Sequence, residues 1–287
     1  MVSESVEDCG ITYFTRYFRR TGTSPLPIPA VFGIRTLAEH LLVLGFAGDH
    51  DTYAITMAAA AWDDDLRELR HDWAWDAVAA SLPAVSAWAA RDNAGPLGPV
   101  ATMTGHRNVL RHYMPNDEPA VLGILSVGDS LCTTNPAYGW GASMALTYAF
   151  AASEAINAGT EDLSSLANRY HTTVGPEAEG VYAESAASDR VRNYRWRKDP
   201  IPAEDHDEAE RQSLIEEGIL PGIMRDAVLA RAFLRRVNLV EPPRALFENP
   251  EVLTHARTRR EKTRARAIAS PTVTREDIIR AIAAARP

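Results

Sequence analysis

The residues best suited to chemistry lie in one stretch, GDSLCTTNPAYGWGA, which begins at Gly128. Asp129 follows a largely apolar run, 120–127, which predicts a buried strand with this carboxylate at its end. A stiff turn with few side chains follows; it contains Pro136, Gly139 and Gly141. Such a turn lets backbone N–H groups approach a flat ligand. A helix is predicted to begin directly afterwards, and a helix N-terminus favours negative charge. The stretch therefore predicts a site for a ligand with hydroxyl groups and negative charge.

The same spacing resembles a known family. Gly128-Asp129 followed by Pro136-x-x-Gly139-x-Gly141 resembles the second flavin-contacting motif of FAD-dependent monooxygenases of the aromatic-hydroxylase type. The fuller string is similar to related epoxidases and polyketide hydroxylases. In that family the aspartate contacts the ribityl chain and phosphates of FAD, and the turn and helix start face the flavin pyrimidine. The resemblance implies FAD-binding roles for Asp129, Pro136, Gly139, Gly141 and Ala142.

Other segments extend the resemblance. Residues 11–17 resemble the central sheet of the family, 106–113 the strand ahead of the motif, and 226–249 the C-terminal helices. The activity implied is that of an oxidoreductase: flavin reduced by NAD(P)H forms a flavin hydroperoxide, which inserts oxygen into a small apolar organic substrate. No residue is assigned as a catalytic acid or base.

One part of the family pattern is missing. Its pyrophosphate site is a Gly-x-Gly-x-x-Gly turn between a strand and a helix. Here only Gly139 and Gly141 stand two apart, and position 144 is Met. We therefore expect a truncated chain that retains FAD weakly or not at all, and an exposed sheet that a partner chain covers. The alternative is a non-catalytic remnant or interaction subunit.

A hydrolase is the more distant alternative. Residues 128–131 spell the GDSL block of a class of serine hydrolases, in which Ser130 would be the nucleophile. The downstream Gly-x-Asn-Asp and Asp-x-x-His motifs of those enzymes are absent. Residues 141–145 also resemble a nucleophile elbow, but Ser143 lies beyond the predicted strand end. Both serines are better explained as loop or helix residues.

The elements around this stretch change character along the chain. Residues 10–20 predict a strand, 40–46 and 52–58 predict a hairpin around Gly48-Asp49-His50-Asp51, and 100–103 and 107–113 predict short strands. From Trp140 onward the pattern is helical, with an expected break near Gly175 and a capping box at Thr274. The fold class predicted is α/β (α+β): the substrate-region sheet and C-terminal helices of a flavin monooxygenase, without its N-terminal Rossmann unit.

These elements predict three regions. They are a sheet-bearing substrate region (1–120), the FAD-contacting motif with its helix (121–160), and a C-terminal helical region (161–287).

Composition limits the remaining classes. The chain has 287 residues and a formal charge of −8, which argues against nucleic-acid binding. Cys9 and Cys132 form neither a disulfide framework nor a zinc site. Residues 63–65 are three aspartates on a predicted helix, where consecutive carboxylates diverge, so no metal is expected. The acidic N-terminus and the short apolar segments predict a cytoplasmic protein with no transmembrane segment.

Other candidates have plainer explanations. His106 and His112 would share one face of a strand and could line a flavin pocket, although a structural role is expected for each. Residues 257–266 are rich in arginine, which on an acidic chain indicates a solvated helix face. Cys132 is expected to pack beside the cofactor site.

Overall fold

The computed structural model describes residues 2–21, 34–90, 92–159, 162–269 and 273–287, which form two compact units. We call Met1–Cys9 with Arg107–Ala269 the helical unit, and Gly10–His106 with Ser270–Pro287 the sheet unit. The sequence-based ranges 1–120, 121–160 and 161–287 divide the chain differently and stay a prediction. The described part of the chain is α+β, as predicted, and all its paired strands are antiparallel.

The sheet unit is built on a six-stranded sheet of order β3-β4-β5-β2-β6, with β7 also paired to β2. Its strands are β2 (Ile11–Arg20), β3 (Ile34–Ala38), β4 (Leu41–Ala47), β5 (Thr52–Ala60), β6 (Ala94–Pro96) and β7 (Ala101–Met103). The strand predicted at 10–20 and the hairpin around Gly48 are confirmed. The proline loop predicted at 25–29 lies outside the described residues.

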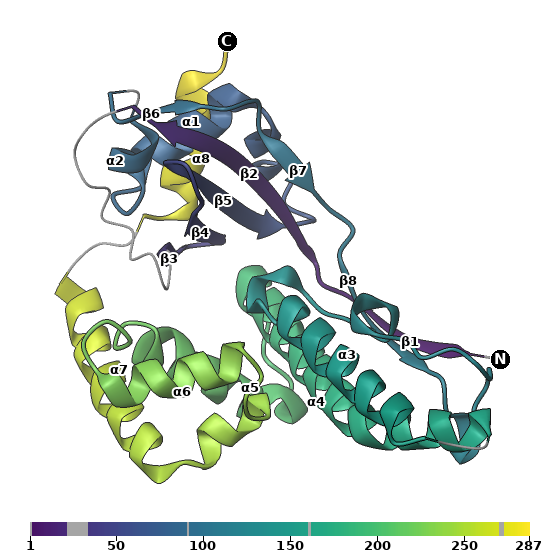
Figure 1. Cartoon of the computed structure of the whole chain (residues 1–287). Helices are drawn as coiled ribbons and strands as arrows, with labels where there is room; N and C mark the ends of the chain where they lie inside the picture. The colour runs from purple at the N-terminus through teal and green to yellow at the C-terminus, as the bar shows by residue number, and fades with distance from the viewer. Residues whose placement is uncertain (1, 22–33, 91, 160–161, 270–272) are drawn as a thin grey trace. The chain divides into compact units, whose positions relative to one another are not determined.

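Helices cover one face of this sheet (Figure 1). They are η1 (Leu66–Arg70), α1 (Asp72–Ser81), α2 (Ser86–Ala89) and α8 (Arg275–Ala285). Because alternate residues of a strand share a face, Phe14 and Phe18 both reach the core around Trp75. The capping box is confirmed: the Thr274 hydroxyl accepts from the Asp277 N–H, and the Asp277 carboxylate accepts from the Thr274 N–H.

The helical unit contains a second, smaller sheet of order β1-β8-β9. Its strands are β1 (Ser3–Asp8), β8 (Arg107–His112) and β9 (Cys132–Thr133). The buried strand predicted at 120–127 is wrong: this segment is irregular, and most of it is exposed. Both edges of β8 are already paired, and Gly123 turns the backbone with φ +80°. Apolar composition was therefore a poor guide to strand pairing here.

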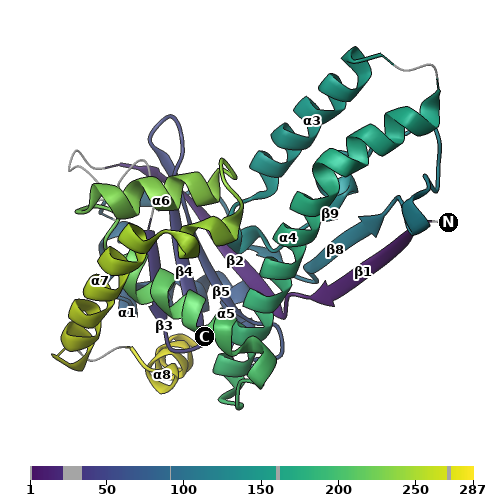
Figure 2. The same ribbon diagram turned by 90° about the horizontal axis from the view of Figure 1, so that it is seen from below.

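Helices make up the rest of this unit. They are α3 (Gly141–Asn157), α4 (Leu163–Arg197), α5 (His206–Ser213), α6 (Ala227–Val237) and α7 (Pro250–Ala269). Short helical segments lie before or between them: η2 (Pro115–Asp117), η3 (Gly128–Ser130), η4 (Pro136–Tyr138), η5 (Ala203–Asp205), the π-turn η6 (Leu214–Ile219) and η7 (Pro243–Glu248). Helices α3 and α4 lie side by side (Figures 1 and 2).

The break predicted near Gly175 is wrong, because α4 continues through Gly175 and Pro176. Val174 and Ala178 on either side are buried in the core shared with α3, and this packing outweighs the helix-breaking residues. Among the described helices, none is long and apolar enough to cross a membrane.

Candidate functional site

The structure brings the two halves of the predicted motif together. Turn η3, which carries Asp129, lies against the first turns of α3. Gly128 has φ +58°, and a Cβ built on it would lie 3.3 Å from the Cβ of Ala145. Glycine is thus favoured at this position both by its backbone conformation and by its closeness to α3. The turn that carries Asp129 and the first turns of α3 are therefore direct neighbours in the helical unit.

This surface is accessible. Every residue predicted to contact the cofactor is exposed: Asp129, Pro136, Gly139, Gly141 and Ala142. Only the backbone carbonyl of Asp129 is engaged, accepting from Arg111 Nη1 at 2.8 Å and Thr133 Oγ1 at 3.1 Å. Its carboxylate makes no hydrogen bond or ion pair with the described residues and is free to accept hydrogen bonds from a ligand.

The N-terminus of α3 is open. Its N-cap residue is Trp140, and within the described ranges no side chain caps the first-turn N–H groups. By contrast, α4, α6 and α8 are capped by Asp162, Asp226 and Thr274. A Cβ built on Gly141 would meet no atom within 4 Å. Unpaired N–H groups beside open space form a binding surface for negative charge.

The C-terminal end of α6 packs against the residues that lead into α3. Gly139 adopts φ +75°, and a Cβ built on it would lie 3.5 Å from Val237 Cγ2. The guanidinium of Arg236 stacks over the ring of Trp140 with 4.9 Å between its Cζ and the ring centroid. The same guanidinium forms an ion pair with the buried carboxylate of Glu184 on α4. The sequence had no local signal for these contacts, which join distant helices.

Neither candidate serine has the surroundings of a nucleophile. The hydroxyl of Ser130 donates to the carbonyl of Val127 at 2.6 Å, which is a local turn bond. The hydroxyl of Ser143 donates to the carbonyl of Val237 at 3.4 Å. A nucleophilic serine instead donates to a general base such as histidine. These bonds explain both serines as structural residues.

Cys132 packs in the core beneath the motif. It is fully buried, and its thiol donates to the carbonyl of Ala178 at 3.7 Å. Burial, with a smaller effect of the nearby Asp129 charge, raises the pKa of Cys132 to about 12. The thiol therefore stays protonated and unreactive near neutral pH.

The two candidate histidines have separate structural partners. His106 belongs to the sheet unit, where its ring meets Tyr13 edge to face, and burial lowers its pKa. His112 belongs to the helical unit, and its Nε2 lies 2.8 Å from the hydroxyl of Ser5. The structure thus gives each imidazole a local partner.

The charge clusters noted in the sequence form ion pairs. Arg260 and Arg264 of α7 pair with Glu210 and Glu217 at 2.6 and 2.5 Å. Asp63 and Asp65 both pair with Arg275 at 2.8 Å. We therefore assign these charges to the stability of each unit.

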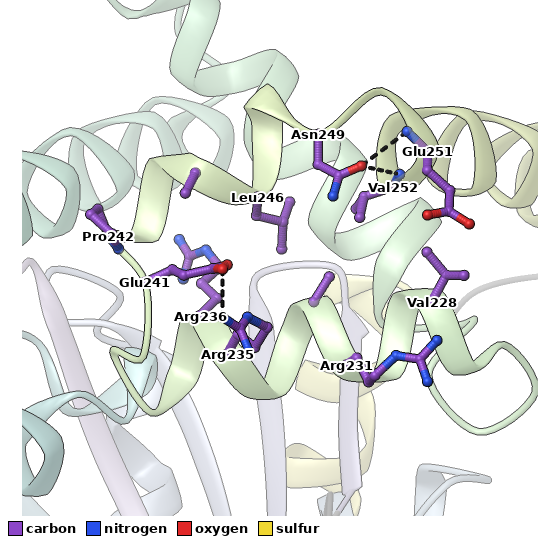
Figure 3. Close-up of a pocket in the computed structure, with 12 residues that line it drawn as sticks. Val228, Arg231, Arg235, Arg236, Glu241, Pro242, Leu246, Asn249, Glu251 and Val252 are labelled. Atoms are coloured by element: carbon purple, nitrogen blue, oxygen red, sulfur yellow. Dashed lines mark hydrogen bonds and ion pairs between the residues drawn. The ribbon is translucent and has the colours of Figure 1, made fainter.

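A small cavity of about 310 Å³ lies between α6, η7 and α7 (Figure 3). Arg231, Arg235 and Glu241 line it, and Arg235 is neutralised by Glu241 at 2.7 Å. Asn249, also in the lining, caps α7 by accepting from the N–H groups of Glu251 and Val252. None of the five predicted cofactor residues lines this cavity.

Comparison with known proteins gives a partial fold likeness only. No protein-family model and no curated protein matches the chain. Among solved structures, the flavin-dependent brominase Bmp2 matches 67% of this chain at 17% identity and a TM-score of 0.44. The flavin-dependent halogenase CmlS matches 74% at 17% identity and 0.48, and 2-methyl-3-hydroxypyridine-5-carboxylic acid oxygenase matches 68% at 14% identity and 0.46. This chain spans 46%, 39% and 50% of the respective proteins.

Proposed function

We propose that this chain forms one side of an FAD site in a monooxygenase-like oxidoreductase that acts on a small apolar organic substrate. The observation that carries the proposal is the open N-terminus of α3 beside the free carboxylate of Asp129. A free carboxylate suits the hydroxyl groups of the flavin's ribityl chain. Open N–H groups suit negative charge on the flavin ring.

Three residues of the motif have distinct roles in this proposal. The carboxylate of Asp129 accepts hydrogen bonds from the ribityl hydroxyl groups. The N–H groups of Gly141 and Ala142 stabilise negative charge on the pyrimidine ring. Gly141 also leaves open the space that a side chain would fill. When bound, FAD supplies the oxygen-transfer chemistry, with NAD(P)H as the reductant.

The rest of the cofactor site comes from another polypeptide segment in this proposal. The sequence has no Gly-x-Gly-x-x-Gly turn to hold the pyrophosphate. Helix α3 presents an exposed row at helical spacing that contains Ala142, Ala145, Leu146, Ala149 and Phe150; we call this row the apolar face of α3. Leu146 is 62% and Phe150 69% exposed, which is typical of an interaction surface. We propose that a dinucleotide-binding segment packs on this face.

A titration of the purified chain with FAD tests the site. We expect a saturable change in flavin absorbance and fluorescence, and we expect Asp129→Ala to weaken binding roughly ten- to a hundredfold, the effect of losing a hydrogen bond to a charged group. The matched control is Asp199→Ala, which removes another exposed carboxylate just beyond α4.

Equal affinity of wild type and Asp129→Ala would remove Asp129 from the site. A folded chain that takes up no FAD, even with a dinucleotide-binding partner supplied, would instead favour the alternative of a non-catalytic interaction subunit. Covalent labelling of Ser130 by a fluorophosphonate probe would favour the hydrolase.

A further inference from the structure

A buried polar cluster lies beneath the turn that leads into α3. Its four members are fully enclosed, each exposed by no more than 1%: Asn108 of β8, Asn135 before η4, and Ser185 and Asp189 of α4. Polar groups this deep are costly unless all of them are hydrogen-bonded. All four members meet this requirement through hydrogen bonds with one another.

Asp189 is at the centre of the cluster. One carboxylate oxygen, Oδ1, accepts from Asn135 Nδ2 at 2.7 Å, from the Tyr138 hydroxyl at 2.8 Å and from Arg192 Nη1 at 2.5 Å. The other, Oδ2, accepts from Asn108 Nδ2 at 2.8 Å. A single carboxylate thus joins β8, α4 and both ends of η4.

The remaining bonds fix the orientation of both amides. Asn135 Oδ1 accepts from the N–H of Ala137 at 3.0 Å, so Asn135 Nδ2 must face Asp189. Asn108 Oδ1 accepts from the Asn135 N–H at 3.0 Å and from the Ser185 hydroxyl at 2.6 Å, so Asn108 Nδ2 must also face Asp189. Neither amide can flip without losing these bonds.

We propose that Asp189 is the positioning residue of the flavin site: through Asn135 and Tyr138 it sets where the N–H groups after Gly139 point. That the bound group is a flavin rests on the proposed function. The effect of Asp189 on the turn can be measured without any cofactor. No local sequence pattern marks Asp189, which lies on a different helix from the motif.

The isosteric change Asp189→Asn isolates this role, because only a carboxylate can face every donor. The variant must turn its new NH2 group either toward Asn108 or toward the three donors at Oδ1. Either arrangement leaves a buried donor without an acceptor. The packing volume is nearly unchanged, so the damage falls on hydrogen bonding at the turn and on the ion pair with Arg192.

Hydrogen exchange of the backbone amides at 135 and 137–139 is the direct test; Pro136 has no N–H. We expect Asp189→Asn to speed their exchange about 5- to 150-fold, the range set by one unsatisfied buried donor. The affinity for FAD should fall by a similar factor, because the N–H groups after the turn are no longer held ready for the ligand.

Asp205→Asn is the matched control. Asp205 is also buried, and it pairs with Arg190 of the same helix α4 at 3.0 Å, but it has no bond to the turn. It should lower global stability without a selective change at 135–139. Wild-type exchange in Asp189→Asn, or an equal change in both variants, would overturn the inference.

Tyr138→Phe is the milder variant should Asp189→Asn fail to fold. It removes one bond to Asp189 while keeping the ring that stacks on Trp140, so a smaller change in the same direction is expected. Unchanged exchange at 135–139 in Tyr138→Phe would then overturn the inference. If the wild-type chain binds no FAD, the proposed function fails, but the exchange measurement still decides whether Asp189 positions the turn.

Discussion

Two aspartates of the helical unit show how surroundings decide what one residue type does. Asp129 is exposed, and only its backbone carbonyl is engaged, so its carboxylate remains available to a ligand. Asp189 is 1% exposed, and both its oxygens are already taken by protein donors. The first suits binding and the second suits positioning. Sequence reasoning found the first because it lies in a motif, and missed the second because its partners come from other elements.

At the same scale, we expect His171 to make the stability of the chain dependent on pH. Its ring is 9% exposed and lies between Tyr113, stacked at 5.7 Å, and Tyr170, edge to face at 5.0 Å. Burial lowers the pKa of His171 below 6.5. The imidazole of His171 therefore binds a proton more readily in the unfolded chain than in the folded chain. Its stabilising effect is present above pH 6.5 and is lost as the pH falls.

We expect His171→Phe, which keeps an aromatic ring in the stack, to reduce the loss of stability between about pH 8 and about pH 5. Urea unfolding midpoints across this range measure the effect. His50→Phe is the control, because the His50 side chain is 87% exposed and folding does not bury it. An equal acid-induced loss in wild type and His171→Phe would contradict the assignment.

At the scale of elements, local patterns were predicted well and tertiary partners poorly. The strand at 10–20, the hairpin around Gly48 and the capping box at Thr274 depend on neighbouring residues, and all three are confirmed. The segment 120–127 has the composition of a strand, but β8, the strand before it in the chain, is already paired on both edges. Strand pairing depends on distant residues, so alternation and composition cannot settle it.

The candidate site divides in the same way. The sequence placed Asp129 before the glycine turn and the helix start, and the structure brings these parts together. It did not reveal that α6 supports the turn through Val237, or that Asp189 holds it from α4. These residues lie on separate helices, and no spacing in the chain connects them.

Substitutions of two helical glycines distinguish an effect on stability from an effect on FAD binding. A Cβ on Gly141 or on Gly175 would meet nothing within 4 Å, so alanine at either position should be tolerated and could add up to about 1 kcal/mol of stability. Only Gly141 lies at the proposed flavin surface. We expect Gly141→Ala to weaken FAD binding while Gly175→Ala leaves it unchanged, with thermal unfolding as the common reference. Equal FAD affinity in the two variants would place the flavin elsewhere.

At the scale of the whole molecule, exposed apolar residues gather around α3. The apolar face of α3 lies against Gly128, which directly follows the segment 121–127, where Leu122 is 54% and Ile124 55% exposed. Isolated exposed apolar residues are ordinary, but for a group of this kind we propose that another polypeptide covers the surface. We propose that such an interaction explains the apolar run at 120–127, which was mistaken for a buried strand.

The double variant Leu146→Gln, Phe150→Gln tests that surface. Both side chains are more than half exposed, so we expect the free energy of unfolding to change by less than about 0.5 kcal/mol. Binding of a hydrophobic dye such as ANS should fall, as should association with a dinucleotide-binding partner. Met224→Gln and Val240→Gln, which change exposed apolar residues elsewhere, should alter neither; a full effect from these controls would argue against a localised surface.

The pairing of β1 with β8 has a further consequence for how the chain can be engineered. Asp8 and Arg107 are direct cross-strand neighbours, so the backbone leaves the helical unit and re-enters it at adjacent positions. Cα atoms of such neighbours lie about 4.5–5.5 Å apart. A tight two-residue reverse turn could therefore replace the whole intervening excursion, giving a minimal module with Asp129, the start of α3 and Asp189 on one uninterrupted scaffold.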